Sequence, residues 1–200
     1  MFYDAVKGEH GLAHNPFKAI IAPRPIGWIS TISRDDHVNL APYSFFNGIC
    51  DTPPMVMFAS SGRKDSIRNC EETGEFVCNL ATLALKDQMN RSSAPVAHDV
   101  DEFKLAGLTA VPSRMVAPPR VGESPAALEC KLLDIIHLAD IDGRPADQYM
   151  ALGQVIGVYI DDAVIRDGMI DVAELQTLAR LGYMDYTAVR DKFAMTRPVE

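Results

Sequence analysis

Alternating apolar and polar positions predict two strands near the start of the chain. Residues 26–33 (IGWISTIS) are rich in β-branched side chains and alternate, which favours a strand. A polar connection at 34–37 leads into a second extended segment, residues 38–46. Pro42 interrupts that segment and cannot donate to a ladder, so we expect an edge strand or a bulge there. The first strand carries Ile26, Trp28, Ser30 and Ile32 on one face and Gly27, Ile29, Thr31 and Ser33 on the other.

The next segments predict two more strands and two helices. Residues 55–59 form a short apolar run of buried-strand type, and residues 75–80 indicate another strand. Between them, we expect a helix that Asp65 caps and Gly74 ends. After the second strand, Thr82 is placed to cap a helix with Leu85 and Met89 on one face.

The second half predicts a long loop, a hairpin and a last helix. Residues 94–125 are rich in Pro and Gly around a short turn or helix at 101–107, which favours an excursion over the body that could serve as a lid or a dimer arm. Residues 126–138 and 149–161 predict two long strands joined by a polar link containing Asp142-Gly143. Residues 171–174 (DVAE) have the form of a capping box, so we expect a helix that carries Leu175, Leu178 and Ala179 and stops at Gly182.

These elements favour a mainly β fold with short helices at the connections. Six or seven strands are predicted, and they do not alternate with helices as a doubly wound fold would require. The consistent architecture is an antiparallel, Greek-key-like barrel. Its 200 residues suit a single domain, residues 1–200, with its own core.

Composition and charge narrow the function classes. Hydrophobic residues make up 48% and charged residues 23%, which is ordinary for a globular chain. The net charge of −8 and the lack of a basic run argue against nucleic acid or an anionic membrane as partner. The first residues do not resemble a signal peptide and no apolar run approaches a membrane span, so we expect a cytoplasmic protein.

Common catalytic and metal motifs are missing from the sequence. Four cysteines without a C-x-x-C spacing are expected to be buried thiols. His10 and His14 lie in a stretch that Gly11 and Pro16 make a poor helix, so we expect loop histidines and no metal site. The chain also lacks G-x-S-x-G, P-loop and G-x-G-x-x-G motifs. A hydrolase triad, a nucleotide triphosphatase and a Rossmann domain are therefore not indicated.

Two segments carry candidate binding chemistry. Residues 41–47 mix aromatic side chains with Ser44 and Asn47, a combination that suits either core packing or a socket for a planar ring with polar edges. Residues 60–66 place serines, Arg63 and Lys64 before the expected helix. They could form a phosphate site or simply a capped surface helix.

Several motifs, in order along nearly the whole chain, resemble the flavin reductase-like family. They are residues 22–26 (APRPI), Ser30-Thr31, 39–47 (NLAPYSFFN), 51–54 (D-x-P-P), 64–69 (K-D-S-x-x-N), 72–76 (ETGEF), 103–109 (FKLAGLT), 125–129 and 180–186 (R-L-G-x-x-x-Y). The resemblance extends to flavoredoxin-like flavoproteins. It implies a split β-barrel that binds FMN, usually as a homodimer with each flavin near the subunit boundary.

The resemblance also assigns site residues. It implies that the isoalloxazine ring and ribityl chain lie along Ser30, Thr31, Ser33, Tyr43, Ser44, Phe45, Phe46 and Asn47, and the phosphate along Ser60, Ser61, Arg63, Lys64 and Ser66. Trp28 stands where many relatives have a smaller aliphatic residue, and it could wall the flavin or fill the barrel. Arg180 and Tyr186 match a late motif that could approach the flavin or the dimer partner, or could belong to an ordinary helix stop.

The resemblance favours a flavin reductase that takes hydride from NADH or NADPH. Such chemistry belongs to the two cofactors and requires no catalytic acid, base or nucleophile from the protein. Asn47 is the candidate for tuning the flavin. Three functions stay open: a reductase that could serve an oxygenase, an FMN electron carrier that exchanges electrons with another redox protein, and a non-catalytic FMN-binding protein.

Overall fold

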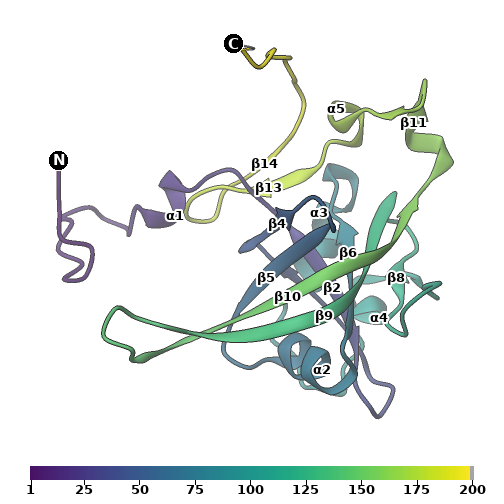
Figure 1. Ribbon diagram of the computed structural model, residues 1–200, viewed down its shortest axis with the longest axis horizontal. Helices are drawn as coiled ribbons and strands as arrows, with labels where there is room; N and C mark the ends of the chain where they lie inside the picture. The colour runs from purple at the N-terminus through teal and green to yellow at the C-terminus, as the bar shows by residue number, and fades with distance from the viewer. Residues whose placement is uncertain (199–200) are drawn as a thin grey trace.

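A seven-stranded antiparallel sheet forms the body of the computed structural model, which describes residues 1–198 (Figure 1). Every pairing within it is antiparallel, as predicted. Along the sheet, the strands are β3 (Val38–Tyr43), β2 (Gly27–Ile32), β6 (Glu75–Leu80), β9 (Ala126–Ala139), β10 (Pro145–Ile160), β5 (Met55–Ser61) and β4 (Phe46–Cys50). The mainly β, antiparallel fold class predicted from the sequence is confirmed.

The sheet curls so that its two ends come together. The rings of Tyr43 on β3 and Phe58 on β5 lie 5.0 Å apart between centroids. Phe45 O accepts a hydrogen bond of 2.8 Å from Ala59 N. The chain passes from one end of the sheet to the other through Ser44 and Phe45 alone. The curl therefore produces a half-open barrel.

The single extended segment predicted over 38–46 is wrong in one respect. Residues 38–50 contain two strands, β3 and β4, at opposite ends of the sheet, because the bend at Ser44 moves the chain from one edge to the other. The edge position predicted from Pro42 is confirmed, since β3 pairs only with β2 in this sheet.

Both faces of β2 are buried. Ile29 lies in the barrel interior with Phe58 and Phe76. Trp28 belongs to an outer cluster with Leu40, which η1 (Leu83–Leu85), α3 (Lys86–Arg91) and α4 (Glu102–Ala106) cover. The alternation in the sequence therefore separates two cores rather than a core from solvent.

Helix α2 (Asp65–Thr73) closes the barrel interior through Ile67 and Cys70. It ends at Gly74, whose φ of 73° is left-handed, as the sequence predicted. Its start differs by one residue. Lys64 is the N-cap and Asp65 is the first helical residue, where its carboxylate pairs with Arg68 instead of capping.

The segment after β6 divides into two short helices. Thr82 occupies the N-cap position of η1, but its side chain makes no capping hydrogen bond, and α3 follows separately. The 94–125 excursion contains α4, which Asp101 caps, and the small sheet of β7 (Ala110–Val111) and β8 (Arg120–Val121). It lies over the outer face of the main sheet.

The predicted hairpin is confirmed, and its strands are longer than expected. β9 continues to Ala139 and β10 begins at Pro145, so the link between them is only residues 140–144. Figure 1 shows this hairpin extending well away from the body of the molecule.

The helix predicted from Asp171 to Gly182 is mostly wrong. Asp171 does cap α5, yet α5 covers only Val172–Leu175, because Gln176 turns left-handed with a φ of 48°. The chain then forms β13 (Leu178–Arg180), between β1 (Arg24–Pro25) and β14 (Tyr186–Ala188). The remaining elements are α1 (Phe17–Ile20), η2 (Asp162–Val164), β11 (Ile165–Arg166) and β12 (Met169–Ile170).

Three of the four cysteines are buried thiols, as expected, but Cys50 is exposed on the edge strand β4. Burial raises the pKa of the Cys70 and Cys78 thiols, which keeps them protonated. Within residues 1–198, no helix is long and apolar enough to cross a membrane.

Candidate functional site

A cavity of about 360 Å³ opens along the edge of β3, next to the start of α2. We call it the β3 pocket. Four parts of the chain meet there: β3, the start of α2, the loop that follows α3 and the first residue of α4. The lining residues are Asn39, Ala41, Pro42, Tyr43, Lys64, Asp65, Ser92, Ser93, Ala94, Pro95, Val96 and Glu102.

The pocket exposes the backbone of an edge strand. Because β3 pairs only with β2 in the sheet, the N–H and C=O groups on its other side have no ladder partner. The Glu102 carboxylate binds one of these N–H groups, accepting a hydrogen bond of 3.0 Å from Leu40 N. Burial raises the pKa of this carboxyl. Pro42, two residues along the same edge, has no N–H, so the main-chain groups that remain there are carbonyl oxygens that can accept from the polar edge of a ligand.

Buried hydroxyl and amide groups lie behind the pocket. Asn39 Nδ2 donates to Thr31 Oγ1 at 3.2 Å and to Ser66 Oγ at 2.9 Å. Asn69 Nδ2 donates to the same Thr31 oxygen at 3.0 Å. This network fixes the start of α2 against β2 and β3.

Ser60 Oγ is a buried polar atom without a partner. Ser60 is only 1% exposed, so water does not reach the hydroxyl freely, and within residues 1–198 the hydroxyl has no hydrogen bond. The Tyr43 hydroxyl lies near Ser60 and Ser66, and burial raises the pKa of that phenol. Tyr43 therefore stays protonated and can donate. An unsatisfied buried hydroxyl of this kind calls for a water or a ligand.

Lys64 supplies positive charge to the pocket. It is the N-cap of the nine-residue α2, where the first backbone N–H groups are free, and it forms no ion pair within the described residues. The neighbouring Asp65 carboxylate is engaged by Arg68 and lies 3.1 Å from His98 Nδ1. The pocket can thus hold an anionic group next to Lys64.

The structure brings together only some of the residues proposed for the phosphate. Lys64 lines the pocket, whereas Ser60 and Ser66 do not line it but lie next to the Tyr43 hydroxyl. The other two are engaged elsewhere: Ser61 Oγ donates to Gln148 Oε1 at 3.0 Å, and Arg63 pairs with Glu71.

The proposed ring segment follows the bend from β3 to β4. Of its aromatic residues, Tyr43 lines the β3 pocket. Phe45 lies under two cations, 5.8 Å from Lys18 Nζ and 5.9 Å from Arg24 Cζ. Asn47 is exposed on β4 and accepts from Gly48 N at 2.9 Å. The partly buried Phe46 packs against Gly27, and Ser44 connects the two strands.

The proposed residues on β2, and Ser33 just after it, serve packing and turns in this structure. Trp28 is fully buried and donates from Nε1 to Ser92 Oγ at 2.9 Å, so it fills the outer core. Ser30 Oγ donates to Pro119 O at 2.5 Å. Ser33 Oγ accepts from Asp35 N and His37 N, which holds the turn.

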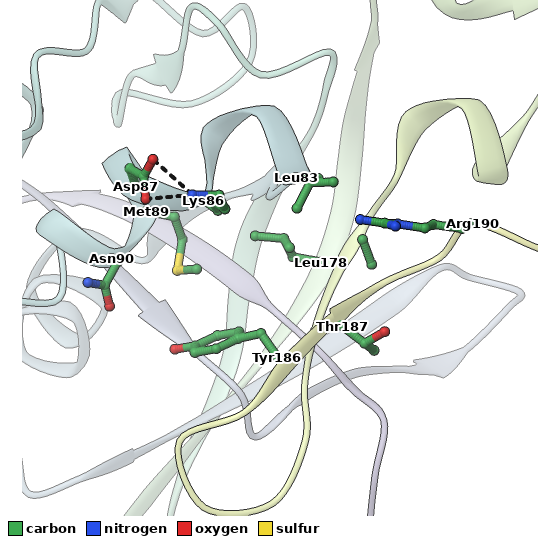
Figure 2. Close-up of a pocket in the computed structure, with 10 residues that line it drawn as sticks. Leu83, Lys86, Asp87, Met89, Asn90, Leu178, Tyr186, Thr187 and Arg190 are labelled. Carbon is green, nitrogen blue, oxygen red and sulfur yellow. Dashed lines mark hydrogen bonds and ion pairs between the residues drawn. The ribbon is translucent and has the colours of Figure 1, made fainter.

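Arg180 and Tyr186 do not line the β3 pocket. They form a pair on β13 and β14, in which the Arg180 guanidinium lies 4.3 Å from the Tyr186 ring centroid and also bonds to its hydroxyl. Tyr186 lines a different cavity of about 600 Å³, between α3 and β14, which we call the C-terminal pocket (Figure 2).

Sequence reasoning missed one wall of the β3 pocket. Residues 92–96 (SSAPV), at the end of α3 and the start of the excursion, and Glu102 were not proposed as site residues. A local signal was present only for the end of α3: Ser92 and Ser93 donate back to Met89 O and Asn90 O, and Pro95 stiffens the loop that follows. The contact of this loop with β3 could not be inferred, because the two segments are far apart in the sequence.

Comparisons with known proteins agree with this fold. Residues 21–177 match the family described as flavin reductase like domain. The protein BH2278 of Halalkalibacterium halodurans is 35% identical over 89% of this chain and 87% of its own. Nitrilotriacetate monooxygenase component B from Bacillus cereus has a TM-score of 0.89 at 26% identity, covering 98% of both chains. Flavoredoxin of Desulfovibrio vulgaris has a TM-score of 0.78 at 24% identity, covering 98% of this chain and 97% of its own.

Proposed function

Because the chain belongs to the flavin reductase-like family, we propose that it is an FMN-dependent oxidoreductase that accepts hydride from NADH or NADPH. The β3 pocket is the proposed FMN site. The observation that carries the proposal is a cation, Lys64, in the β3 pocket, together with an unsatisfied buried hydroxyl, Ser60, next to Tyr43, which lines that pocket; all three lie inside the family-matched segment.

The chemistry of the pocket fits the two ends of FMN. A phosphate needs a cation and donors, which Lys64 and the first N–H groups of α2 offer. A ring with polar edges needs hydrogen-bonding partners, and the open edge of β3 offers main-chain carbonyl acceptors, since Glu102 already binds Leu40 N and Pro42 has no N–H. The Tyr43 hydroxyl offers a donor. The Ser60 hydroxyl would gain its missing partner from a bound ligand or from a water that the ligand orders.

The size of the pocket fits a partly exposed cofactor. Its volume of about 360 Å³ lies at the lower end of the range for small-molecule sites. One face of a ring held there would remain open to a second planar molecule. Bound FMN would supply the hydride acceptor, while the residues of the pocket would hold and orient it.

The roles of the protein groups are positional and electrostatic. Lys64 would bind the phosphate, and Tyr43, protonated by burial, would donate to the cofactor or to Ser60. Asn47 lies on β4, outside the lining of the β3 pocket, so its tuning role would require the ring to extend along the bend at Ser44.

Similarity to nitrilotriacetate monooxygenase component B supports an oxygenase as the acceptor of the electrons. We also propose a homodimer, in which a second copy would cover part of the open pocket. Neither proposal is needed for hydride transfer to the flavin.

Anaerobic reduction tests the proposed function. The purified protein, reconstituted with FMN and freed of excess, should lose its oxidised flavin absorbance on addition of NADH or NADPH. Free FMN at the same concentration is the control for uncatalysed reduction. If bound flavin stays oxidised with both donors but is reduced by a redox protein, the chain is an electron carrier, and the hydride proposal fails.

A further inference from the structure

The C-terminal pocket is a second cavity with its own chemistry. Its volume of about 600 Å³ is large enough for a small organic ligand. Figure 2 shows α3 and η1 on one side and β14 on the other. None of the residues that line it lines the β3 pocket.

The floor of this pocket is apolar. Leu178 and Met89 are 3% and 2% exposed and belong to the outer core, and Leu83 packs against the same cluster. Met89 is an unbranched side chain that adapts to the shape of what it contacts. The floor therefore favours the apolar face of a ligand.

An aromatic ring forms one wall. Figure 2 shows the Tyr186 ring lying across the pocket from Met89 and Leu178. The Arg180 guanidinium, 4.3 Å from the ring centroid, and its bond to the Tyr186 hydroxyl hold the ring in place. Tyr186 is 39% exposed, so ring surface remains free for a ligand. A fixed ring facing an apolar floor selects for a flat molecule.

Charge at the mouth is positive. Lys86 Nζ is paired with both oxygens of Asp87, at 2.9 and 3.0 Å. Arg190 has no ion pair or hydrogen bond within residues 1–198, and Figure 2 shows its guanidinium pointing over the pocket toward Leu83 and Lys86. The three charges add to one net positive charge. A guanidinium with free donors is suited to a carboxylate or phosphate.

We propose that the C-terminal pocket binds a planar ring that carries an anionic group. The ring lies between Tyr186 and the Met89–Leu178 floor, and the anion bonds to Arg190. Two sources fit this chemistry: an aromatic carboxylate, or the adenylate end of a nucleotide. This site is separate from the β3 pocket, although Asn90 of the one and Ser92 of the other are only two residues apart.

Matched pairs of probes test the proposal by calorimetry on the FMN-saturated protein, so that the β3 pocket is filled. Benzoate is compared with neutral benzamide, and AMP with neutral adenosine. We expect at least one anion to bind at least tenfold more tightly than its neutral partner, and the better anion to identify the source.

Two variants locate the binding. Arg190→Gln should weaken the better anion about tenfold without changing the affinity for the neutral partner. Arg144→Gln removes the same charge at the tip of the β9–β10 hairpin. It is the control, and it should change neither the affinity for the anion nor the affinity for its neutral partner. The proposal is overturned if neither anion binds at millimolar concentration, or if Arg190→Gln binds the anion as tightly as the parent protein. FMN affinity, measured separately, reports on the proposed function independently.

Discussion

Replacing Ala41 with phenylalanine is expected to abolish FMN binding while the protein stays folded. Ala41 is a half-buried residue of β3 and lines the β3 pocket, so a phenyl group there would occupy the volume that the cofactor needs. An aromatic side chain is well tolerated on an edge strand, which spares the sheet. We expect the dissociation constant for FMN to rise about 100-fold or more, a loss of roughly 2.8 kcal/mol.

Quenching of flavin fluorescence on titration with protein measures this effect. Ala146→Phe is the matched control, because Ala146 is an exposed residue of β10 near the tip of the hairpin. It should bind FMN like the parent protein. Unchanged FMN affinity in a folded Ala41→Phe variant would place the cofactor outside the β3 pocket.

Loss of Trp28 is expected to have the largest effect on stability. Its side chain is fully buried in the outer core, so Trp28→Ala should lower the free energy of unfolding by about 3–5 kcal/mol. Ser92→Ala should cost about 1–3 kcal/mol, because it leaves the buried Trp28 Nε1–H without an acceptor. The same Ser92 begins the loop that lines the β3 pocket.

Urea unfolding followed by circular dichroism compares these variants. Tryptophan fluorescence is unsuitable, since Trp28 is the only tryptophan in the chain. Ser93→Ala is the control, because that exposed hydroxyl bonds only to the nearby Asn90 O among the residues that the structure describes. A Trp28→Ala variant that loses less than about 1 kcal/mol would show that the tryptophan does not support the outer core.

Local patterns were sufficient for most of the scaffold. The strand near Trp28, the hairpin around residues 140–144 and the end of α2 at Gly74 all follow from short-range chemistry, namely alternation, turn residues and a left-handed glycine. The edge position of β3 followed from Pro42 alone.

Tertiary contacts decided the parts that were predicted wrongly. Leu178 and Ala179 have the spacing of a helix, yet β13 forms because it pairs with both β1 and β14, and Leu178 N donates to Ala81 O at 2.9 Å. The passage from β3 to β4 across the open side of the barrel likewise depends on the curl of the whole sheet. Neither contact has a local signal.

The candidate site was predictable in part for the same reason. Lys64 and the serines around it could be proposed from a helix start, which is a local feature. The opposite wall, formed by residues 92–96 and Glu102, reaches β3 only because the end of α3 and the excursion after it fold back over the outer core. Tyr186 carries the family motif, but its pairing with Arg180 places it in the C-terminal pocket instead.

A crystal structure of the protein saturated with FMN tests the central claim most directly. The account predicts the phosphate beside Lys64 and the start of α2, the cofactor along the open edge of β3, and a partner for the Ser60 hydroxyl. FMN bound in the C-terminal pocket beside Tyr186, with the β3 pocket holding only water, would contradict it.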